Sequence, residues 1–386
     1  MSRFLFVVPP LTGHTLPTVA VARELVERGH EVAWAGHADL VGPLLPAGAR
    51  LFDVGGAGAV VALREQSQGL RGAAAFRFLW EDFLIPLADA MVGPVEAAVD
   101  AFRPEVLVVD QQALAGALVA RRRGLPWATS ATTSAELTDP FALMPKLGEW
   151  ARSCLRELQQ RFGVPDEGPD LRFSDHLVLA FTTAALIGPV EGFGDHFAFV
   201  GPSLGGRGEA PDFPWHWIDP ARRLVLVSLG TVSRESGDRF FGTVIEALEP
   251  LATELQAVLV APPDRYPDLH EHLLVREYVP QVELLAHVAG VISHAGHNTV
   301  CESLAHGVPL VVAPIRDDQP IIAQQVVEAG AGVRVRYGRV GATELRAALR
   351  SILDDRAYRV AARRVGASFD AAGGAATAAD RLEKLT

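Results

Sequence analysis

The chain has 386 residues, of which 49% are hydrophobic and 21% charged, and its formal net charge at pH 7 is −11. This length favours two α/β domains over a single core, and the negative charge argues against a nucleic-acid partner. Its two cysteines, Cys154 and Cys301, are far apart, which excludes a disulfide framework and a zinc ribbon. No apolar run approaches the roughly 20 residues that span a bilayer. Because the first residues also lack a signal-peptide pattern, we expect a cytoplasmic protein with no membrane insertion.

The first half of the chain alternates apolar strands with helices, the pattern of a parallel α/β sheet. The opening strand, turn and helix are Rossmann-like, but the turn contains Gly13 in place of a G-x-G-x-x-G run. This argues against a nicotinamide or flavin dinucleotide. Strands are predicted at 4–8, 31–35, 106–109, 177–180 and 196–200, and the stretch 121–127 indicates the end of a helix and the entry to a further strand.

Two ionisable residues stand at the carboxyl ends of these strands, the edge at which such sheets bind ligands. His14 comes soon after the first strand, and Asp110 directly follows the strand at 106–109. A lone histidine at this point is more often a structural residue at a helix start. A neighbouring carboxylate would orient the imidazole and stabilise its protonated form, which would make His14 a general base.

Helical patterns over 59–102 and 141–162 carry many aromatic and aliphatic side chains. These side chains either form the core, which is the commoner case, or line an apolar cleft that receives a ligand. The candidates for such a lining are Phe76, Trp80, Phe83, Phe141 and Met144.

A stretch rich in glycine and proline, from 205 to 220, indicates a linker between two domains. The chain closes with a helical pattern over 356–385, and Gly373 and Gly374 interrupt it, which predicts a kink. Between these segments the α/β pattern resumes, with a helix predicted at 240–255 and strands at 224–229, 256–260, 310–313 and 332–335.

The stretch 291–326 reads strand, loop, helix, strand, loop, helix. Gly296 in the first loop lets a ligand approach the backbone, and the start of the next helix suits a phosphate. Glu302 lies three residues after Thr299, so the two residues could form a capping box at that helix start. In the functional alternative, the Glu302 carboxylate accepts hydrogen bonds from ribose hydroxyls. The side-chain donors in this loop are His294, Asn298 and Thr299.

The pair His294 and His297 could be read as metal ligands, but the sequence offers no third ligand. The chain also contains no D-x-D motif. We therefore expect no metal and no other cofactor.

Taken together, these motifs resemble those of family 1 nucleotide-sugar glycosyltransferases, in particular the bacterial branch that acts on macrolides and other natural products. The resemblance covers essentially the whole chain and is most specific over 278–325. The matching residues are Gly13-His14, Asp110, Val200-Gly-Pro-Ser203, Ser228-Leu-Gly230, Tyr278-Val-Pro-Gln281, His294-x-Gly-x-Asn-Thr299, Glu302, Gly307-Val-Pro309 and Asp318-Gln319.

This resemblance implies a GT-B fold, an α/β architecture in which two Rossmann-like parallel-sheet domains face each other across a cleft. The implied domains are an acceptor-binding domain over 1–205, a linker over 206–221 and a nucleotide-sugar-binding domain over 222–365. The implied C-terminal helix, 366–386, returns to the N-terminal domain.

The resemblance also implies roles for single residues. His14 would deprotonate the acceptor hydroxyl, and Asp110 would balance its charge. The implied contacts to the nucleoside are Tyr278, Val279, Gln281 and Glu302. The implied contacts to the diphosphate are Ser228, Thr231, His294, Gly296, Asn298 and Thr299, and those to the donor sugar are Asp318 and Gln319, with His297 at a position where many plant members carry tryptophan.

The implied activity is inverting transfer of a hexose from a UDP- or dTDP-sugar to a hydroxyl of a hydrophobic small molecule of polyketide, macrolide, flavonoid or terpenoid type. Asp318 and Gln319 favour a hexose such as glucose. Tyr278 stands where many members carry tryptophan, and Thr15-Leu16 replaces a common Val-Asn after the histidine. Two alternatives stay open. One is a GT-B enzyme of different chemistry, a UDP-sugar epimerase or a lipid-linked GlcNAc transferase, and the other is a catalytically silent helper protein.

Overall fold

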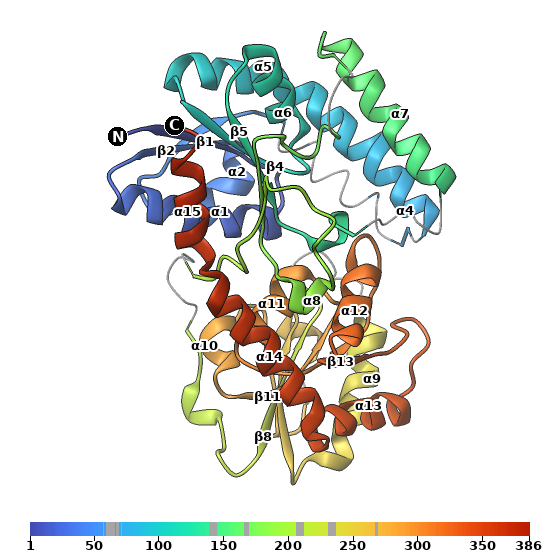
Figure 1. Cartoon of the computed structure of the whole chain (residues 1–386). Coiled ribbons are helices and arrows are strands. Elements are labelled where there is room, and N and C mark those ends of the chain that lie inside the picture. Colours follow the sequence, from blue (N-terminus) through green and yellow to red (C-terminus); the bar gives the residue numbers. More distant parts are fainter. Residues whose placement is uncertain are drawn as a thin grey trace. The chain divides into compact units, whose positions relative to one another are not determined.

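The computed structural model describes residues 1–56, 58, 66, 69–70, 72–138, 145–165, 170–205, 212–230, 237–266 and 269–386. The chain divides into two compact units, each built on its own sheet (Figure 1). Unit 1 comprises Met1–Thr183, Pro189–Gly208 and Ala372–Thr386, and unit 2 comprises Ala184–Gly188 and Glu209–Ala371. The domain limits implied by the family resemblance stay a prediction. Among the described residues, no helix is long and apolar enough to cross a membrane.

Unit 1 contains a parallel sheet with the strand order β3-β2-β1-β4-β5-β6-β7 in the described part of the chain. Every strand pair in it is parallel, so all its carboxyl ends meet at one edge. The strands predicted for the first half are confirmed, and the short strand β3 escaped prediction. Their bounds are β1 Arg3–Val7, β2 Glu31–Gly36, β3 Arg50–Asp53, β4 Val106–Asp110, β5 Trp127–Ala131, β6 Leu177–Ala180 and β7 Phe197–Phe199.

Helices cover both faces of this sheet (Figure 1). One face packs against α5, α6 and α7, and the other packs against α1 and α15. Successive strand residues point to opposite faces, so Val109 belongs to the first core and Val108 to the second. The helices are α1 Thr12–Glu27, α2 Ala38–Val41, α4 Ala73–Arg77, α5 Ile85–Phe102, α6 Leu114–Arg123, α7 Pro145–Arg161 and α15 Gly374–Glu383, with a π-helical segment, η2, at Phe78–Leu84.

Unit 2 contains a second parallel sheet, with the order β10-β9-β8-β11-β12-β13 among the described residues. Its central strands β8, β11 and β12 are buried along nearly their whole length, as expected for a sheet covered on both faces. The strands are β8 Arg223–Ser228, β9 Leu255–Val260, β10 Leu273–Arg276, β11 Val288–Ser293, β12 Leu310–Val312 and β13 Gly332–Arg334. The helices are α8 Ala184–Ile187, α9 Asp238–Leu248, α10 Gln281–Leu285, α11 His297–Ala305, α12 Gln319–Glu328, α13 Ala342–Asp354 and α14 Arg356–Ala372.

One predicted helix was too long. The pattern indicated a helix over 240–255, but α9 ends at Leu248, a short 3-10 turn occupies Glu249–Leu251, and β9 begins at Leu255. Pro250 explains this end, because a proline inside a helix removes a backbone donor and clashes with the preceding turn.

The C-terminal segment breaks where two glycines predicted a kink. Helix α14 ends at Ala372, Gly373 adopts a φ of 84°, and α15 begins at Gly374. Helix α15 then packs against α1 within unit 1. The amide of Gly374 donates a hydrogen bond of 2.7 Å to the carbonyl of Val200, which fixes the start of α15 on this unit.

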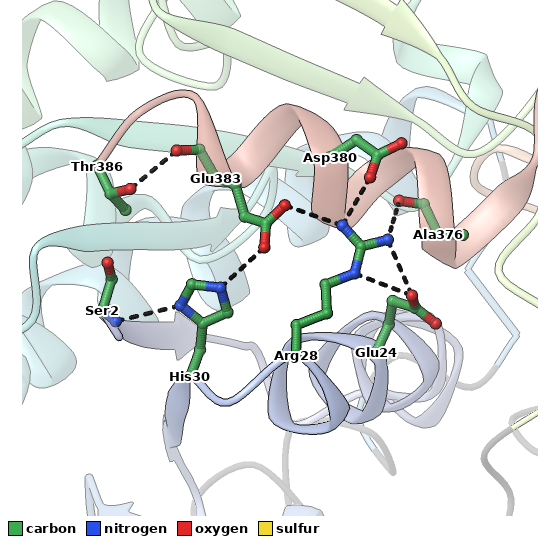
Figure 2. A network of polar contacts seen from close by, with 8 residues as sticks. All are labelled: Ser2, Glu24, Arg28, His30, Ala376, Asp380, Glu383 and Thr386. Carbon is green, nitrogen blue, oxygen red and sulfur yellow. Dashed lines mark hydrogen bonds and ion pairs between the residues drawn. The ribbon is translucent and has the colours of Figure 1, made fainter.

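A polar network ties α15 to α1 (Figure 2). The Arg28 guanidinium donates to the carboxylates of Glu24, Asp380 and Glu383 at 2.6–3.0 Å. His30 Nε2 lies 2.9 Å from Glu383 Oε1, and the backbone N–H of Ser2 donates to His30 Nδ1 at 3.1 Å. Because Nδ1 accepts a hydrogen bond, Nε2 carries the ring hydrogen and donates a hydrogen bond to Glu383. One arginine and one histidine thus hold the last helix on unit 1.

Candidate active site

His14 lies in the first turn of α1, just beyond the carboxyl end of β1. Leu11 is the N-cap of this helix, and the backbone N–H of His14 donates a hydrogen bond of 3.0 Å to the carbonyl of Leu11. The His14 side chain is 15% exposed, whereas Asp110, the last residue of β4, is completely buried. Because β1 and β4 are neighbours in the sheet, their carboxyl ends bring the two side chains together.

The two side chains meet as the sequence led us to expect. His14 Nδ1 lies 2.9 Å from Asp110 Oδ1 and 3.0 Å from Oδ2. Two further donors reach the carboxylate: the backbone N–H of Gln112 at 2.8 Å and the hydroxyl of Thr132 at 2.7 Å. Thr132 follows β5, the next strand in the sheet, and its hydroxyl oxygen also lies 2.8 Å from His14 Nδ1.

This geometry determines where the imidazole carries its proton. The Thr132 hydroxyl has one hydrogen, which it donates to Asp110, so its oxygen can only accept from His14 Nδ1. Nδ1 therefore carries the ring hydrogen, and Nε2 carries the lone pair. A ring held in this way can take up a proton at Nε2 while the buried carboxylate stabilises the positive charge.

Thr132 is the member of this group that the sequence did not indicate. A threonine after a buried strand is common, and only the pairing of Asp110 with Ser130 across β4 and β5 shows that Thr132 reaches the carboxylate. Once that pair is known, the position of Thr132 two residues after Ser130 indicates the contact.

The second group of candidate residues lies in unit 2, where β8 and β11 end side by side. Their last residues, Ser228 and Ser293, are register partners, and each strand continues into a loop that carries a glycine. His294 lies between Gly230 and Gly296. A Cβ atom built on either glycine would come within 2.6 Å of the His294 ring, so both positions have to be glycine for the ring to keep its place.

Burial lowers the pKa of His294 to about 4, and the nearby Asp318 carboxylate opposes this shift only in part. The imidazole is therefore neutral at physiological pH and acts as a hydrogen-bonding group without a charge. The loop around it is strained, because Ala295 adopts a φ of 69°, a value that residues with a side chain rarely take. Such strain is often found at ligand-binding loops.

Helix α11 begins directly after this loop, with Gly296 as its N-cap. The capping box that the sequence left open, with Thr299 as N-cap, is thus wrong, because Thr299 lies inside the first turn. A glycine N-cap has no side chain with which to bind the first N–H groups of the helix, and these groups with the positive end of the helix dipole suit an anion. Gly296, Asn298 and Thr299 lie at this helix start as predicted.

Glu302 is buried inside α11, and its Oε2 accepts a hydrogen bond of 2.6 Å from Gln281 Nε2. Gln281 is the first residue of α10, so this bond joins two of the predicted nucleoside contacts. Tyr278, three residues earlier, is 58% exposed, and the neighbouring Val279 is partly exposed. An exposed tyrosine three residues before the glutamine that binds a buried carboxylate is a combination of side chains that suits a base and its ribose.

The loop that leads to α12 contains the predicted contacts to the donor sugar. Asp318 is the N-cap of α12, and Gln319 is its first residue. Gln319 Oε1 accepts hydrogen bonds from the backbone N–H groups of Ile315 and Arg316 at 2.9 and 3.1 Å. The side-chain oxygen of Gln319 thus holds the backbone of this loop. A hydrogen bond from Gln319 to a sugar would therefore come from its amide nitrogen.

His297 is buried in the first turn of α11, and its Nε2 lies 3.5 Å from Cys301 Sγ. Among the described residues, no group of three or more His, Cys, Asp or Glu side chains could hold a metal ion. The sequence had already offered no third ligand for the pair His294 and His297.

Three of the side chains predicted to line an acceptor cleft pack against other side chains of unit 1. Trp80 and Phe83 lie in η2 and are buried in the core of unit 1, and the Arg172 guanidinium lies 5.6 Å from the Trp80 ring centre. Phe76 packs edge-on against Trp150. This packing matches the core alternative, and contact with an acceptor stays a prediction. Thr231, Phe141 and Met144 lie outside the described residues.

Comparisons with known proteins identify the family. Residues 208–367 match the family described as UDP-glucoronosyl and UDP-glucosyl transferase. The chain is 30% identical to 4'-demethylrebeccamycin synthase of Lentzea aerocolonigenes, over 100% of this chain and 99% of that protein. It is also 30% identical to demethyllactenocin mycarosyltransferase of Streptomyces fradiae, over 100% of this chain and 87% of that protein.

The fold has solved counterparts. The crystal structure of the glycotransferase of kitacinnamycin superposes with a TM-score of 0.79 at 26% identity and covers 100% of this chain and 98% of that one. Two Rossmann-like parallel sheets are the architecture named GT-B, so the predicted fold is confirmed. The chain therefore belongs to the UDP-glucoronosyl and UDP-glucosyl transferase family, the family 1 glycosyltransferases, and is a nucleotide-sugar-dependent enzyme.

Proposed function

We propose that this glycosyltransferase moves a hexose, with inversion, from a UDP- or dTDP-sugar to a hydroxyl group of a hydrophobic natural product, with His14 as the general base. The observation that carries the proposal is the hydrogen-bonded group of His14, Asp110 and Thr132, in which the lone pair is at Nε2. A base of this kind is what a neutral hydroxyl needs to become a nucleophile.

The acceptor class rests on relatives. Demethyllactenocin mycarosyltransferase and 4'-demethylrebeccamycin synthase match the whole of this chain, and the names of both refer to natural products. We therefore place hydrophobic natural products of polyketide, macrolide, flavonoid or terpenoid type first among the acceptors to be tried.

In the proposed reaction, the acceptor oxygen forms a bond with the anomeric carbon of the sugar while its proton passes to His14 Nε2. The bond between this carbon and the diphosphate oxygen breaks on the opposite face, and the nucleoside diphosphate leaves with the electron pair. Asp110 stabilises the imidazolium that results. General-base help of this kind contributes roughly 10²- to 10⁴-fold to the rate.

The leaving diphosphate gains negative charge, which the start of α11 is suited to receive. His294 is neutral in this setting, because burial lowers its pKa to about 4, and so would contribute a hydrogen bond and not a full charge. Glu302, held by Gln281, is placed to accept hydrogen bonds from ribose hydroxyls. We propose that these groups bind the donor without a metal ion.

The stereochemistry of the product tests this proposal. The wild-type enzyme is incubated with an α-linked UDP- or dTDP-hexose and a phenolic or macrolide acceptor, and the anomeric configuration of the product is read from its proton NMR coupling constant. A β-glycoside whose rate of formation is unchanged by EDTA supports direct displacement without a metal. An α-glycoside, or a rate that EDTA abolishes and Mg²⁺ restores, contradicts it.

A further inference from the structure

Gln111, the residue after Asp110, has a buried amide group for which the described part of the chain supplies no hydrogen-bond partner. Its side chain is 1% exposed, and within the described part of the chain neither Oε1 nor Nε2 has a hydrogen-bond partner. Buried amides are nearly always paired, because the loss of water without a replacement bond is costly. A buried amide with both atoms unpaired is therefore an exception that calls for a physical cause.

The position of Gln111 suggests the cause. It lies in the turn that follows β4, in which the N–H of Ala113 donates to the carbonyl of Asp110. Its neighbours on either side, Asp110 and Gln112, belong to the group that holds His14. The amide is thus one residue away from the partner of the proposed base, at the ligand-binding edge of the sheet.

A second side chain shares this property. His37 directly follows β2, is 2% exposed, and its Nδ1 has no hydrogen-bond partner among the described residues. By the two-residue period of strands, His37 continues the row of Ala35, and Gln111 continues the row of Val109. Both rows belong to the same face of the sheet, and β2 and β4 flank β1, the strand that leads to His14.

We propose that Gln111 is a specificity-determining residue whose amide receives a second polar group of the acceptor, a hydroxyl or a carbonyl, apart from the hydroxyl that is glycosylated. This rests on the proposed function. A primary amide can donate to a carbonyl and accept from a hydroxyl, so it suits oxygenated acceptors such as polyphenols and polyketides and discriminates against their analogues that lack the group.

The chain offers a matched control. Gln256 in β9 is buried to a similar degree, 2% exposed, but its amide is paired at both ends. Its Oε1 accepts from the backbone N–H of Asp219 at 3.2 Å, and its Nε2 donates to the Asp219 carbonyl at 3.0 Å. Replacement by methionine keeps the length of either side chain and removes only the polar atoms.

Thermal unfolding of Gln111→Met and Gln256→Met is the first arm of the test and needs no acceptor. We expect Gln256→Met to lower Tm by about 2–6 °C, because it removes two hydrogen bonds and takes from the backbone N–H of Asp219 the acceptor that it has in the wild type, while the Asp219 carbonyl keeps its bond from the N–H of Arg222. Gln111→Met should raise Tm or leave it unchanged, because it removes unpaired atoms. A fall in Tm for Gln111→Met equal to that of Gln256→Met would mean that the fold itself satisfies the amide, and would overturn the proposal.

The second arm is kinetic. A set of polyphenols is assayed, each paired with the analogue that lacks one hydroxyl distant from the glycosylated position. Gln111→Met should lower kcat/KM about 3- to 10-fold for at least one hydroxylated compound and leave its deoxygenated partner unchanged. Equal loss for both members of every pair, or no loss for any compound, contradicts the proposal. If the wild type transfers sugar to no acceptor, the proposed function fails, and the thermal arm still decides whether the amide is unpaired.

Discussion

Replacement of Thr132 by valine removes one hydroxyl and keeps the shape of the side chain, so it tests how the proposed base is held. The wild-type hydroxyl donates to Asp110 Oδ2 at 2.7 Å and lies 2.8 Å from His14 Nδ1. In the variant, the carboxylate keeps the bonds from His14 and from the N–H of Gln112. His14 should therefore still act as a base, but without the hydrogen bonds of the Thr132 hydroxyl that help to hold it and Asp110 in place.

The size of the effect follows from these bonds. A hydrogen bond to a charged group contributes about 1.5–3 kcal/mol. If this is lost in the transition state, where the charge on His14 develops, kcat should fall about 10- to 100-fold. Since the substrates do not touch the hydroxyl in this account, KM for the donor should change little. Thr132→Ser, which restores the hydroxyl, should recover most of the rate.

Thr129→Val is the matched control. Thr129 lies within β5, three residues before Thr132, and its hydroxyl donates to the carbonyl of Arg172 and accepts from the N–H of Ser174. This variant should lose stability and keep kcat. Release of nucleoside diphosphate, measured under saturating donor and acceptor, compares the variants. Full activity of Thr132→Val, or an equal loss of kcat in Thr129→Val, would refute the reasoning.

Three further predictions concern unit 2. The pKa of His294 is lowered to about 4 from an ordinary value of 6.5, so the unfolded chain takes up the proton first as the pH falls. The free energy of unfolding should therefore decline by roughly 3 kcal/mol between pH 6.5 and pH 4 from this residue, and denaturant titrations should show a shallower decline in His294→Gln. Glu302→Ala should raise KM for the donor about 10-fold or more with a smaller change in kcat, since it removes the carboxylate that Gln281 holds. An unchanged KM for the donor would argue against a contact between Glu302 and the ribose. Gly296→Ala should weaken binding of UDP in calorimetry, because its Cβ would lie 2.6 Å from the His294 ring, whereas Gly338→Ala, which faces open space, should bind as the wild type does.

The sequence carried enough information for both sheets, because buried parallel strands are continuous apolar runs with loops and helices between them. The same logic brought His14 and Asp110 together, since both stand at strand ends and such ends share one edge. The short strand β3, Arg50–Asp53, was not found, because only its two middle residues are apolar and partly buried, while the charged residues at its two ends are exposed.

The details of the site depended on features that a sequence does not display. Thr132 reaches Asp110 only because β5 is the neighbour of β4, and strand order has to be seen. Gly296 and Thr299 are both acceptable N-caps, so the start of α11 could not be chosen from the residues alone. That the amide of Gln111 is buried without a hydrogen-bond partner among the described residues depends on the packing around it and could not be predicted from its residue type.

The central claim is that His14 is the base of an acceptor-dependent sugar transfer. The most direct test is release of UDP or dTDP with a panel of nucleotide sugars and aromatic or macrolide acceptors, with wild type and His14→Ala compared. If His14 is the base, release requires an acceptor and falls at least about a hundredfold in the variant. Equal acceptor-dependent release in the two proteins would remove His14 from the role of base. Conversion of the donor into another sugar nucleotide without any acceptor would contradict the transfer itself.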